Sequence, residues 1–297
     1  MDVKQPEPLC KQVEKLKEHG CEIADFEEAL LILSKINYYK LSAYFLPFRL
    51  DDGTYASGTS LIKVYKIYQF ERQLISFLYG VIQEIEVFIK TQIAYYHSNK
   101  YGALGYMNTS NMDPKAADHH AKLMEQFADE IERNSDLPFV KHHIQNYDGN
   151  FPLWVAIELF TLGNTSRFYS QMLTSDKKAI ANVISNITGI HCTHSQLGSC
   201  LYCLTILRNK CAHFSRIYYS IFPATPKLPK SEEKKANINV TKYVYLFQYI
   251  FVLKMLYPSP DSWCIIVTAL KAMIEAYSEF IDIKHIGFPD NWEELLS

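Results

Sequence analysis

The longest regular pattern of hydrophobic and polar positions lies between about residues 60 and 98. Apolar side chains recur there at spacings of three and four residues, the period of one helix face: Val64, Ile67, Phe70, Leu74, Phe77, Val81, Ile85, Phe88 and Ile89. Thr59 or Ser60 precedes the first turn, where a side-chain oxygen can cap the free N–H groups. The pattern predicts a helix roughly 55–60 Å long, which can serve as the spine of a bundle.

Shorter periodic segments with capping signals predict further helices on both sides of this spine. We expect helices at 7–20, after Asp25, and at 37–45, 113–134, 138–147, 164–172, 175–186, 241–257 and 260–283. A further helix begins after Pro152, contains Trp154 and Glu158, and has Gly163 near its end. Asn291 is expected to cap a last turn. Residues 50–55 predict a turn, and segment 47–57 has room for a small β-hairpin. Residues 222–239 contain three prolines and predict an exposed loop.

The overall organisation follows from what separates these segments. The 297 residues include only 11 glycines and 12 prolines, and we find no internal repeat and no linker that would divide the chain. We therefore expect an all-α protein with a single domain over residues 1–297. Its core would span about 60–257, with an N-terminal helical extension at 1–58 and C-terminal helices at 258–297.

A charged side chain interrupts the apolar stripe of another predicted helix, within residues 197–219. The stripe consists of Leu197, Leu201, Leu204, Leu207 and Cys211. Arg208 falls between Leu204 and Cys211 instead of on the polar side. Because an arginine cannot lose its charge, its burial requires a carboxylate partner, a second subunit or a bound anion. Asn209 and His213 follow, one turn apart, and share a neighbouring face.

Two interpretations of this arrangement stay open at this point. The first is a buried arginine–carboxylate pair beside a partly exposed histidine. The second is a phosphate-handling site, in which Arg208 holds the oxygens and His213 moves a proton. Glu86, near the middle of the long helix, is the carboxylate we select as a partner for Arg208. An ordinary solvated glutamate at that position is the simpler alternative.

Composition narrows the classes of ligand and compartment. Hydrophobic residues make up 48% and aromatic residues 14%, which excludes a disordered chain. The net charge of -2 argues against loose, charge-driven coating of nucleic acid, so an RNA would bind in a local groove. Seven cysteines without a signal peptide favour reduced thiols in a cytoplasm. No apolar run approaches the roughly 20 residues of a membrane span.

Other chemistries find little support in the sequence. Neighbouring histidines on a helix point in different directions, so neither His119-His120 nor His142-His143 can chelate a metal ion alone. His191-x-x-His194 lacks a second pair of ligands, and we therefore expect no bound metal. Cys200-x-x-Cys203 lies inside a predicted helix and not after a strand, which predicts buried thiols. We find no nucleophile elbow and no Gly-rich phosphate loop, and we expect no cofactor. The basic side chains of the 222–239 loop are candidates for RNA backbone contact or are simply solvated: Lys227, Lys230, Lys234 and Lys235.

Several motifs carry a family resemblance. Arg208 to His213 resembles the Arg-x4-His motif of HEPN ribonucleases, and the longer Leu-Arg-Asn-x-Cys-Ala-His-x-Ser-Arg segment (207–216) resembles the Abi-like family, the AbiD/AbiF type of phage abortive-infection proteins. Further similar segments occur in the family's order at 36–44, 70–74, 85–87, 154–163 and 287–292. Phe214 is a departure, because many relatives carry a second histidine there.

The resemblance implies a HEPN-like helical bundle that cleaves RNA without a metal ion. The RNA 2′-hydroxyl would attack the neighbouring phosphate and leave a 2′,3′-cyclic phosphate. His213 would act as general base or acid, Arg208 would stabilise charge on the phosphate oxygens, and Asn209 would orient His213 or donate to the phosphate. The residues that would support this site are Glu86, Glu158, Lys210, Ser215 and Arg216.

The resemblance also implies an assembly and a biological role. One histidine cannot easily act on both sides of phosphorus, and the family's answer is a two-fold dimer that brings two motifs into one cleft. The role would be phage defence in a bacterial cytoplasm, held in check by a regulatory non-coding RNA or a protein antitoxin, with no membrane involved. The alternatives are a non-catalytic protein of the same fold that holds a structured non-coding RNA, and a scaffold without RNA affinity.

Overall fold

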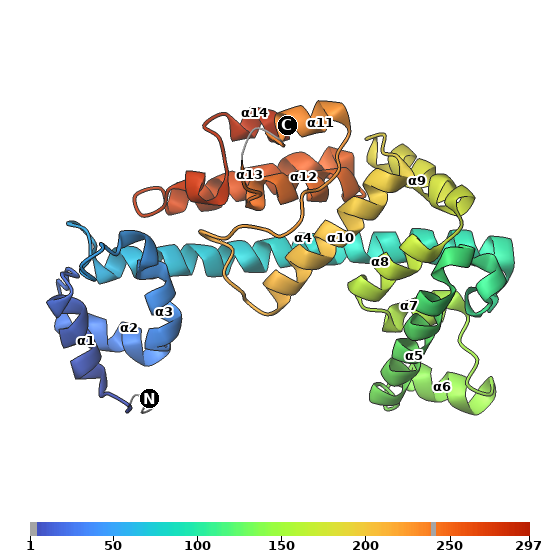
Figure 1. Cartoon of the computed structure of the whole chain (residues 1–297), viewed down its shortest axis with the longest axis horizontal. Helices are drawn as coiled ribbons and strands as arrows, with labels where there is room; N and C mark the ends of the chain where they lie inside the picture. The colour runs from blue at the N-terminus through green and yellow to red at the C-terminus, as the bar shows by residue number, and fades with distance from the viewer. Residues whose placement is uncertain (1–4, 239–241) are drawn as a thin grey trace. The chain divides into compact units, whose positions relative to one another are not determined.

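The computed structural model describes residues 5–238 and 242–297, and these residues form helices joined by turns (Figure 1). No strand occurs among them, which confirms the predicted all-α class. The chain divides into two compact units, one of residues up to 75 with 269–283 and the other of 76–268 with 284–297. The single-domain organisation stays a prediction. Two helices contribute to both units: α4 (Leu61–Tyr101) and α13 (Pro260–Ala276).

The long amphipathic pattern forms α4, which extends over 41 residues. Its apolar positions Val64, Phe70 and Leu74 are fully buried, as the pattern predicts. Of the two capping candidates it is Ser60 that acts, because its Oγ accepts from the backbone N–H of Lys63 at 3.1 Å.

The first unit packs three short helices with the first part of α4. These are α1 (Leu9–Glu18), α2 (Phe26–Lys35) and α3 (Tyr38–Phe45). Asp25 caps α2 as predicted, since its Oδ1 accepts from the backbone N–H groups of Glu27 at 2.8 Å and Glu28 at 3.1 Å. Inside this unit the hydroxyl of Tyr44 donates to the carboxylate of Glu71, which satisfies a buried charge on α4.

The β-hairpin considered for segment 47–57 is reduced to a single backbone bridge between Arg49 and Tyr55. The 3₁₀ turn η1 (Leu46–Phe48) occupies one of its arms. On the other arm the N–H of Tyr55 donates to the carbonyl of His19 at 2.7 Å. This arm is held both by the end of α1 and by the opposite arm, since the N–H of Ala56 donates to the carbonyl of Phe48 and the N–H of Leu50 donates to the carbonyl of Thr54, each at 2.8 Å.

The second unit contains most of the helices. They are α5 (Ala117–Arg133), α6 (Pro138–Asn146), α7 (Leu153–Leu159), α8 (Leu162–Gln171), α9 (Thr174–Thr188), α10 (His194–Ala212), α11 (Lys230–Lys235), α12 (Leu246–Leu256) and α14 (Trp292–Leu296), with 3₁₀ turns at Gly105–Met107 (η2), Thr109–Asn111 (η3), Pro114–Ala116 (η4) and Ile283–Ile286 (η5). Helix α10 packs against α8, α9 and α12. Thr193 and Gln196 form a capping box at its start. Its apolar stripe is buried: Leu197, Cys200, Leu201, Cys203, Leu204, Leu207 and Cys211.

Several helix ends differ from the prediction, and α13 ends at Ala276 and not at residue 283. The helix after Pro152 stops at Leu159, because the Oγ1 of Thr161 accepts from the N–H of Asn164 at 3.1 Å and starts α8. Gly163 therefore belongs to the first turn of α8, close to Thr205 of α10. At the C-terminus α14 forms, but the side chain of Asn291 makes no capping hydrogen bond.

Segment 222–239 is not the open loop that its composition predicts. It contains the short helix α11, and several of its side chains are buried, among them Leu228, Glu232 and Ala236. Their spacing of four residues places them on one helical face. Asn239 lies outside the described residues, as does the predicted start of the next helix at Thr241, and α12 begins at Leu246.

A buried carboxylate ties α9 to the end of α4. Asp176, in the first turn of α9, is fully buried and accepts hydrogen bonds from Lys100, from the Tyr101 hydroxyl at 2.7 Å and from the Tyr96 hydroxyl at 3.1 Å. Burial by itself would raise the pKa of Asp176, but these hydrogen bonds outweigh it and hold the pKa below its ordinary value. Because the pKa of Asp176 is lower in the folded state than in the unfolded state, the ionised carboxylate stabilises the fold above about pH 4. This stabilisation is lost as the pH falls through the folded-state pKa.

Replacing Asp176 by asparagine is expected to lower the free energy of unfolding by about 3 kcal/mol at pH 7. Lys100 keeps 40% of its side chain exposed and can rehydrate, which places the cost at the low end for a broken buried pair. Urea unfolding at pH 7 and at pH 3 measures both the loss and its decrease in acid. The control Asp129→Asn changes an exposed aspartate on α5 and should cost less than about 0.5 kcal/mol. An equal loss in both variants would contradict this assignment.

Candidate active site

Arg208 is the half-buried cation of α10. Its side chain is 26% exposed, and its Nε lies 3.8 Å from Oε2 of Glu86 on α4, the partner selected from the sequence. This distance makes an ion pair but not a hydrogen bond, and neither of the two atoms has another partner. The terminal nitrogens of the guanidinium have no hydrogen-bond partner among the described residues. Arg208 is thus anchored through its Nε while its terminal donors stay available.

Glu86 is shared between two cations. Its Oε1 lies 3.0 Å from Nζ of Lys90, one turn further along α4, and both of these side chains are about nine-tenths buried. The cluster of Lys90, Glu86 and Arg208 therefore contains two positive charges and one negative charge. An uncompensated charge in a half-buried position is costly unless an anion or water meets it.

His213 stands at the end of α10 and is exposed. The sequence predicted a helix over 197–219, but the helix ends at Ala212 in a Schellman arrangement. The N–H of Phe214 donates to the carbonyl of Cys211 at 3.0 Å, and the N–H of Ser215 donates to that of Lys210 at 2.8 Å. Phe214 takes the left-handed conformation (φ 46°) that glycine usually supplies. The imidazole of His213 has no side-chain partner among the described residues.

Asn209 and His213 share one exposed face of α10. Tyr202, which is 58% exposed, lies on the same face because the three residues are separated by seven and four positions. Arg208 and His213 are five positions apart, which turns them about 140° from each other around the helix. Within a single chain the two side chains do not make contact, so the expectation that they face the same anion needs a further element.

The other supporting residues are placed differently. Nζ of Lys210 donates to the carbonyl of Arg216 at 3.3 Å and to Oγ of Ser220 at 3.0 Å, and it lies over the ring of Phe222. Lys210 thus holds the segment after α10. Ser215 is exposed, and Arg216 is half-buried. Glu158 lies on α7, in a cavity of its own that is considered below.

The lysines near α11 remain candidates for RNA contact without further support. Lys227, Lys230 and Lys234 are exposed, whereas Lys235 is half-buried and pairs with Glu232 at 3.4 Å. The backbone just before α11 is tied to α10, since the N–H of Lys227 donates to Oγ of Ser199 at 3.0 Å.

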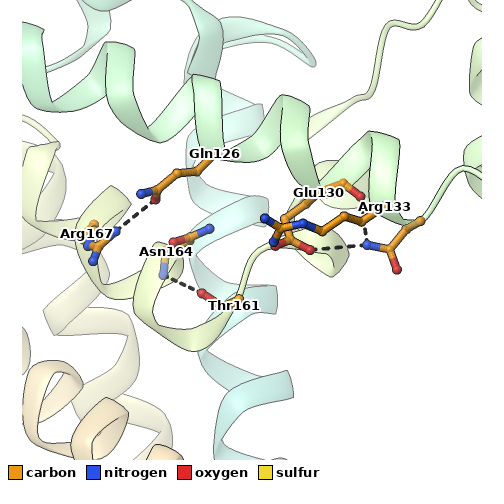
Figure 2. Close-up of polar contacts among 7 residues, drawn as sticks. Gln126, Glu130, Arg133, Thr161, Asn164 and Arg167 are labelled. Atoms are coloured by element: carbon orange, nitrogen blue, oxygen red, sulfur yellow. Dashed lines mark hydrogen bonds and ion pairs between the residues drawn. The ribbon is translucent and has the colours of Figure 1, made fainter.

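A basic cavity of about 490 Å³, which was not predicted from the sequence, lies between η4, α5 and α8. Lys115, Lys122 and Arg167 line it together with His119 and Asp113, and none of the three cations has a carboxylate partner among the described residues. Arg167 donates to the side-chain oxygen of Gln126 at 2.9 Å, while the neighbouring carboxylate of α5, on Glu130, pairs with Arg133 (Figure 2). The spacing of Lys115, His119 and Lys122, four and then three residues apart, could have indicated a common basic face. Arg167, which lies on α8, could not have been placed beside them from the sequence.

Other histidine and cysteine side chains lie outside this candidate site. Across residues 5–238 and 242–297 no group of histidine, cysteine and acidic side chains could hold a metal ion. The thiols of Cys200 and Cys203 are buried as predicted, and burial raises the pKa of Cys203 to about 11. Burial also lowers the pKa of His97 to about 4, so this imidazole is neutral at pH 7. None of the described helices is both long and apolar enough to span a bilayer.

Comparison with known proteins places the chain in a family. A family model described as Abi-like protein matches residues 31–219, more than half of the chain, and this range includes Glu86, Glu158 and the whole of α10. No protein of curated function and no solved structure shows significant similarity. The chain belongs to the Abi-like protein family.

Proposed function

We propose that this chain is a metal-independent RNA endonuclease that uses Arg208 and His213 on the scissile phosphate. Membership of the Abi-like family suggests abortive infection, a defence against phage. The observation that carries the catalytic proposal is the cluster of Lys90, Glu86 and Arg208, whose net positive charge and free guanidinium donors suit a phosphate. The basic cavity of Lys115, Lys122 and Arg167 supports the binding of further phosphates of the same strand.

The proposed reaction needs only a base, an acid and a cation. The RNA 2′-oxygen attacks the adjacent phosphorus and loses its proton to a base, while the bond between phosphorus and the 5′-oxygen breaks and that oxygen receives a proton. The products are a 2′,3′-cyclic phosphate and a 5′-hydroxyl end, and no water is consumed. His213 serves as base or acid, and the Arg208 guanidinium stabilises charge on the phosphate oxygens.

A two-fold dimer would complete this site. Arg208 and His213 of one chain diverge around α10, so a phosphate between two α10 helices could meet the arginine of one chain and the histidine of the other. The exposed Tyr202 beside Asn209 and His213 supports an interface on this face. We place the protein in the bacterial cytoplasm, restrained by a regulatory RNA or a protein antitoxin.

The test is cleavage of RNA by the purified protein in an excess of chelator, followed by analysis of the product ends and of the protein's mass in solution. The proposal expects cleavage without metal, 2′,3′-cyclic phosphate ends, and a dimer at micromolar concentration. Cleavage that depends on added Mg²⁺, or that leaves 5′-phosphate ends, would overturn the chemistry. A fully active monomer would overturn the composite site.

A second function is favoured by the solvent-facing position of His213 and by the separation of the two motif side chains within one chain. In this alternative the protein binds a structured non-coding RNA without cutting it, through the basic cavity and exposed aromatic side chains. Equal RNA affinity with no cleavage, in both the wild type and a His213→Ala variant, would establish the binder in place of the nuclease.

A further inference from the structure

A second cavity, of about 380 Å³, lies between the later part of α4 and α7. Its volume falls within the range of sites that hold small ligands. It is lined by Thr91, Ala94, Tyr95, Ser98 and Asn99 of α4 and by Trp154, Ile157 and Glu158 of α7. Trp154 and Glu158 are four residues apart and so extend from the same face of α7. They are also the two side chains of the family-like segment 154–163 that the catalytic proposal leaves without a role.

The aromatic walls of this cavity are unusually open to solvent. Trp154 is 54% exposed and Tyr95 is 71% exposed, and neither ring stacks on another aromatic ring among the described residues. Tryptophan is usually largely buried, and the other two of the chain, Trp263 and Trp292, follow that rule. A large, flat apolar surface that faces a cavity is suited to a planar ligand.

The polar lining of the cavity is rich in acceptors and contains no cation. The Glu158 carboxylate has no partner among the described residues and can only accept hydrogen bonds at pH 7. The amide nitrogen of Asn99 donates to the carbonyl of Tyr95 at 2.8 Å, which leaves its oxygen as an acceptor. The hydroxyl oxygen of Ser98 is buried without a hydrogen-bond partner. The Glu158 carboxylate repels phosphate, and the acceptor oxygens of the lining favour a planar ligand that carries N–H groups on one edge.

Among the RNA bases guanine matches this lining best. Its Watson–Crick edge presents a ring N–H beside an amino group, and a carboxylate can accept from both at once, whereas adenine, cytosine and uracil each present one such donor group on that edge. We propose that this cavity binds one unpaired guanine base of an RNA strand, stacked on Trp154 and held at its edge by Glu158. This inference rests on the proposed function and names the sequence preference of that RNA.

A neighbouring cavity extends the binding surface. It has a volume of about 440 Å³ and shares Tyr95 and Asn99 with the guanine site. Its remaining lining includes Tyr96, Ile180 and Val183. The next base of the strand can lie there, on the other side of the Tyr95 ring, which is how single-stranded RNA is held on successive aromatic side chains.

Tryptophan fluorescence reports on this site directly, because Trp154 is exposed and the other two tryptophans are buried. The probes are 2′-O-methyl tetranucleotides UUGU, UUAU, UUCU and UUUU, which the proposed nuclease cannot cleave. We expect UUGU to quench the emission at the lowest concentration, by about tenfold relative to UUAU. Trp154→Leu should weaken UUGU binding by about 5- to 150-fold, measured by calorimetry. Glu158→Gln should remove the preference for guanine. The control Tyr147→Leu, another exposed aromatic residue, should leave the affinity unchanged.

Three results would overturn the guanine site. They are no quenching by any probe, equal quenching by all four probes, and unchanged UUGU affinity in Trp154→Leu. If this variant with unchanged affinity also has an altered mass in solution, Trp154 belongs to a protein interface. Because the probes cannot be cut, this outcome is separate from the nuclease proposal. If the preference for guanine is absent while unmodified RNA is still cleaved, only the guanine site is wrong. If UUGU is bound preferentially but no RNA is cleaved, only the nuclease proposal is wrong.

Discussion

A His213→Ala variant is expected to cleave RNA about 10²–10⁴-fold more slowly than the wild-type protein, the contribution typical of a general acid or base. The fold should not change, because the side chain is exposed and has no partner among the described residues. The cap of α10 is made by the backbone of residues 210–215 and so survives the substitution. The measurement is the single-turnover cleavage rate at pH 7 in excess chelator, with the free energy of unfolding from urea titration beside it.

The control for this variant is His191→Ala. His191 is another exposed histidine of the same unit, just before α10, and it has no partner among the described residues. Its variant should retain the wild-type cleavage rate and the wild-type free energy of unfolding. A His213→Ala protein that cuts RNA as fast as the His191→Ala control would exclude His213 from the chemistry.

The helices could be predicted wherever local signals agree. Interactions between residues about one helical turn apart predict the apolar period of α4, the cap at Asp25 and the apolar stripe of α10. The structure confirms all three. The end of α10 could not be predicted, because no glycine or proline lies within the ten residues after Ala212. Phe214 adopts the left-handed conformation there, and only tertiary packing can stabilise a bulky residue in it.

The candidate site was partly accessible from the sequence. The position of Arg208 on an apolar stripe required a partner, and Glu86 on the long helix provides one. The second cation, Lys90, stands four residues after Glu86, a spacing that could have been noticed. The divergence of Arg208 and His213 around α10 also follows from helix geometry. The expectation that Arg208 and His213 act on one phosphate was one of the two interpretations that the helix pattern left open, and it remains a proposal that rests on a second subunit.

The cavities could not be predicted, since each combines helices that are distant in the sequence. Arg167 of α8 joins Lys115 and Lys122 near α5 only after folding. In the same way Trp154 of α7 meets Tyr95 of α4. An exposed tryptophan has no signature in the sequence, because exposure depends on which elements fail to cover it.

An Arg208→Gln variant is expected to lower the RNA cleavage rate by about 10²–10³-fold, as the loss of one charge-stabilising donor group does in other enzymes. The fold should persist, because Glu86 keeps its 3.0 Å contact with Lys90. The free energy of unfolding should therefore fall by no more than about 1–2 kcal/mol. Single-turnover cleavage and urea titration again supply the two measurements. Arg208→Lys retains the charge without the planar fork and should recover only part of the rate.

A double variant distinguishes a catalytic arginine from a structural one. If Arg208 served only as the partner of Oε2 of Glu86, then replacing both residues by glutamine would remove the carboxylate oxygen that Arg208→Gln leaves without a partner and would restore the cleavage rate. If the guanidinium acts on the phosphate, the double variant stays as slow as Arg208→Gln, whatever its stability. We expect the slow result, with Glu86→Gln alone retaining much of the activity because the terminal nitrogens of Arg208 do not depend on Glu86 for their hydrogen bonds. Recovery of the rate in the double variant would assign Arg208 to the fold and leave the nuclease proposal without its cation.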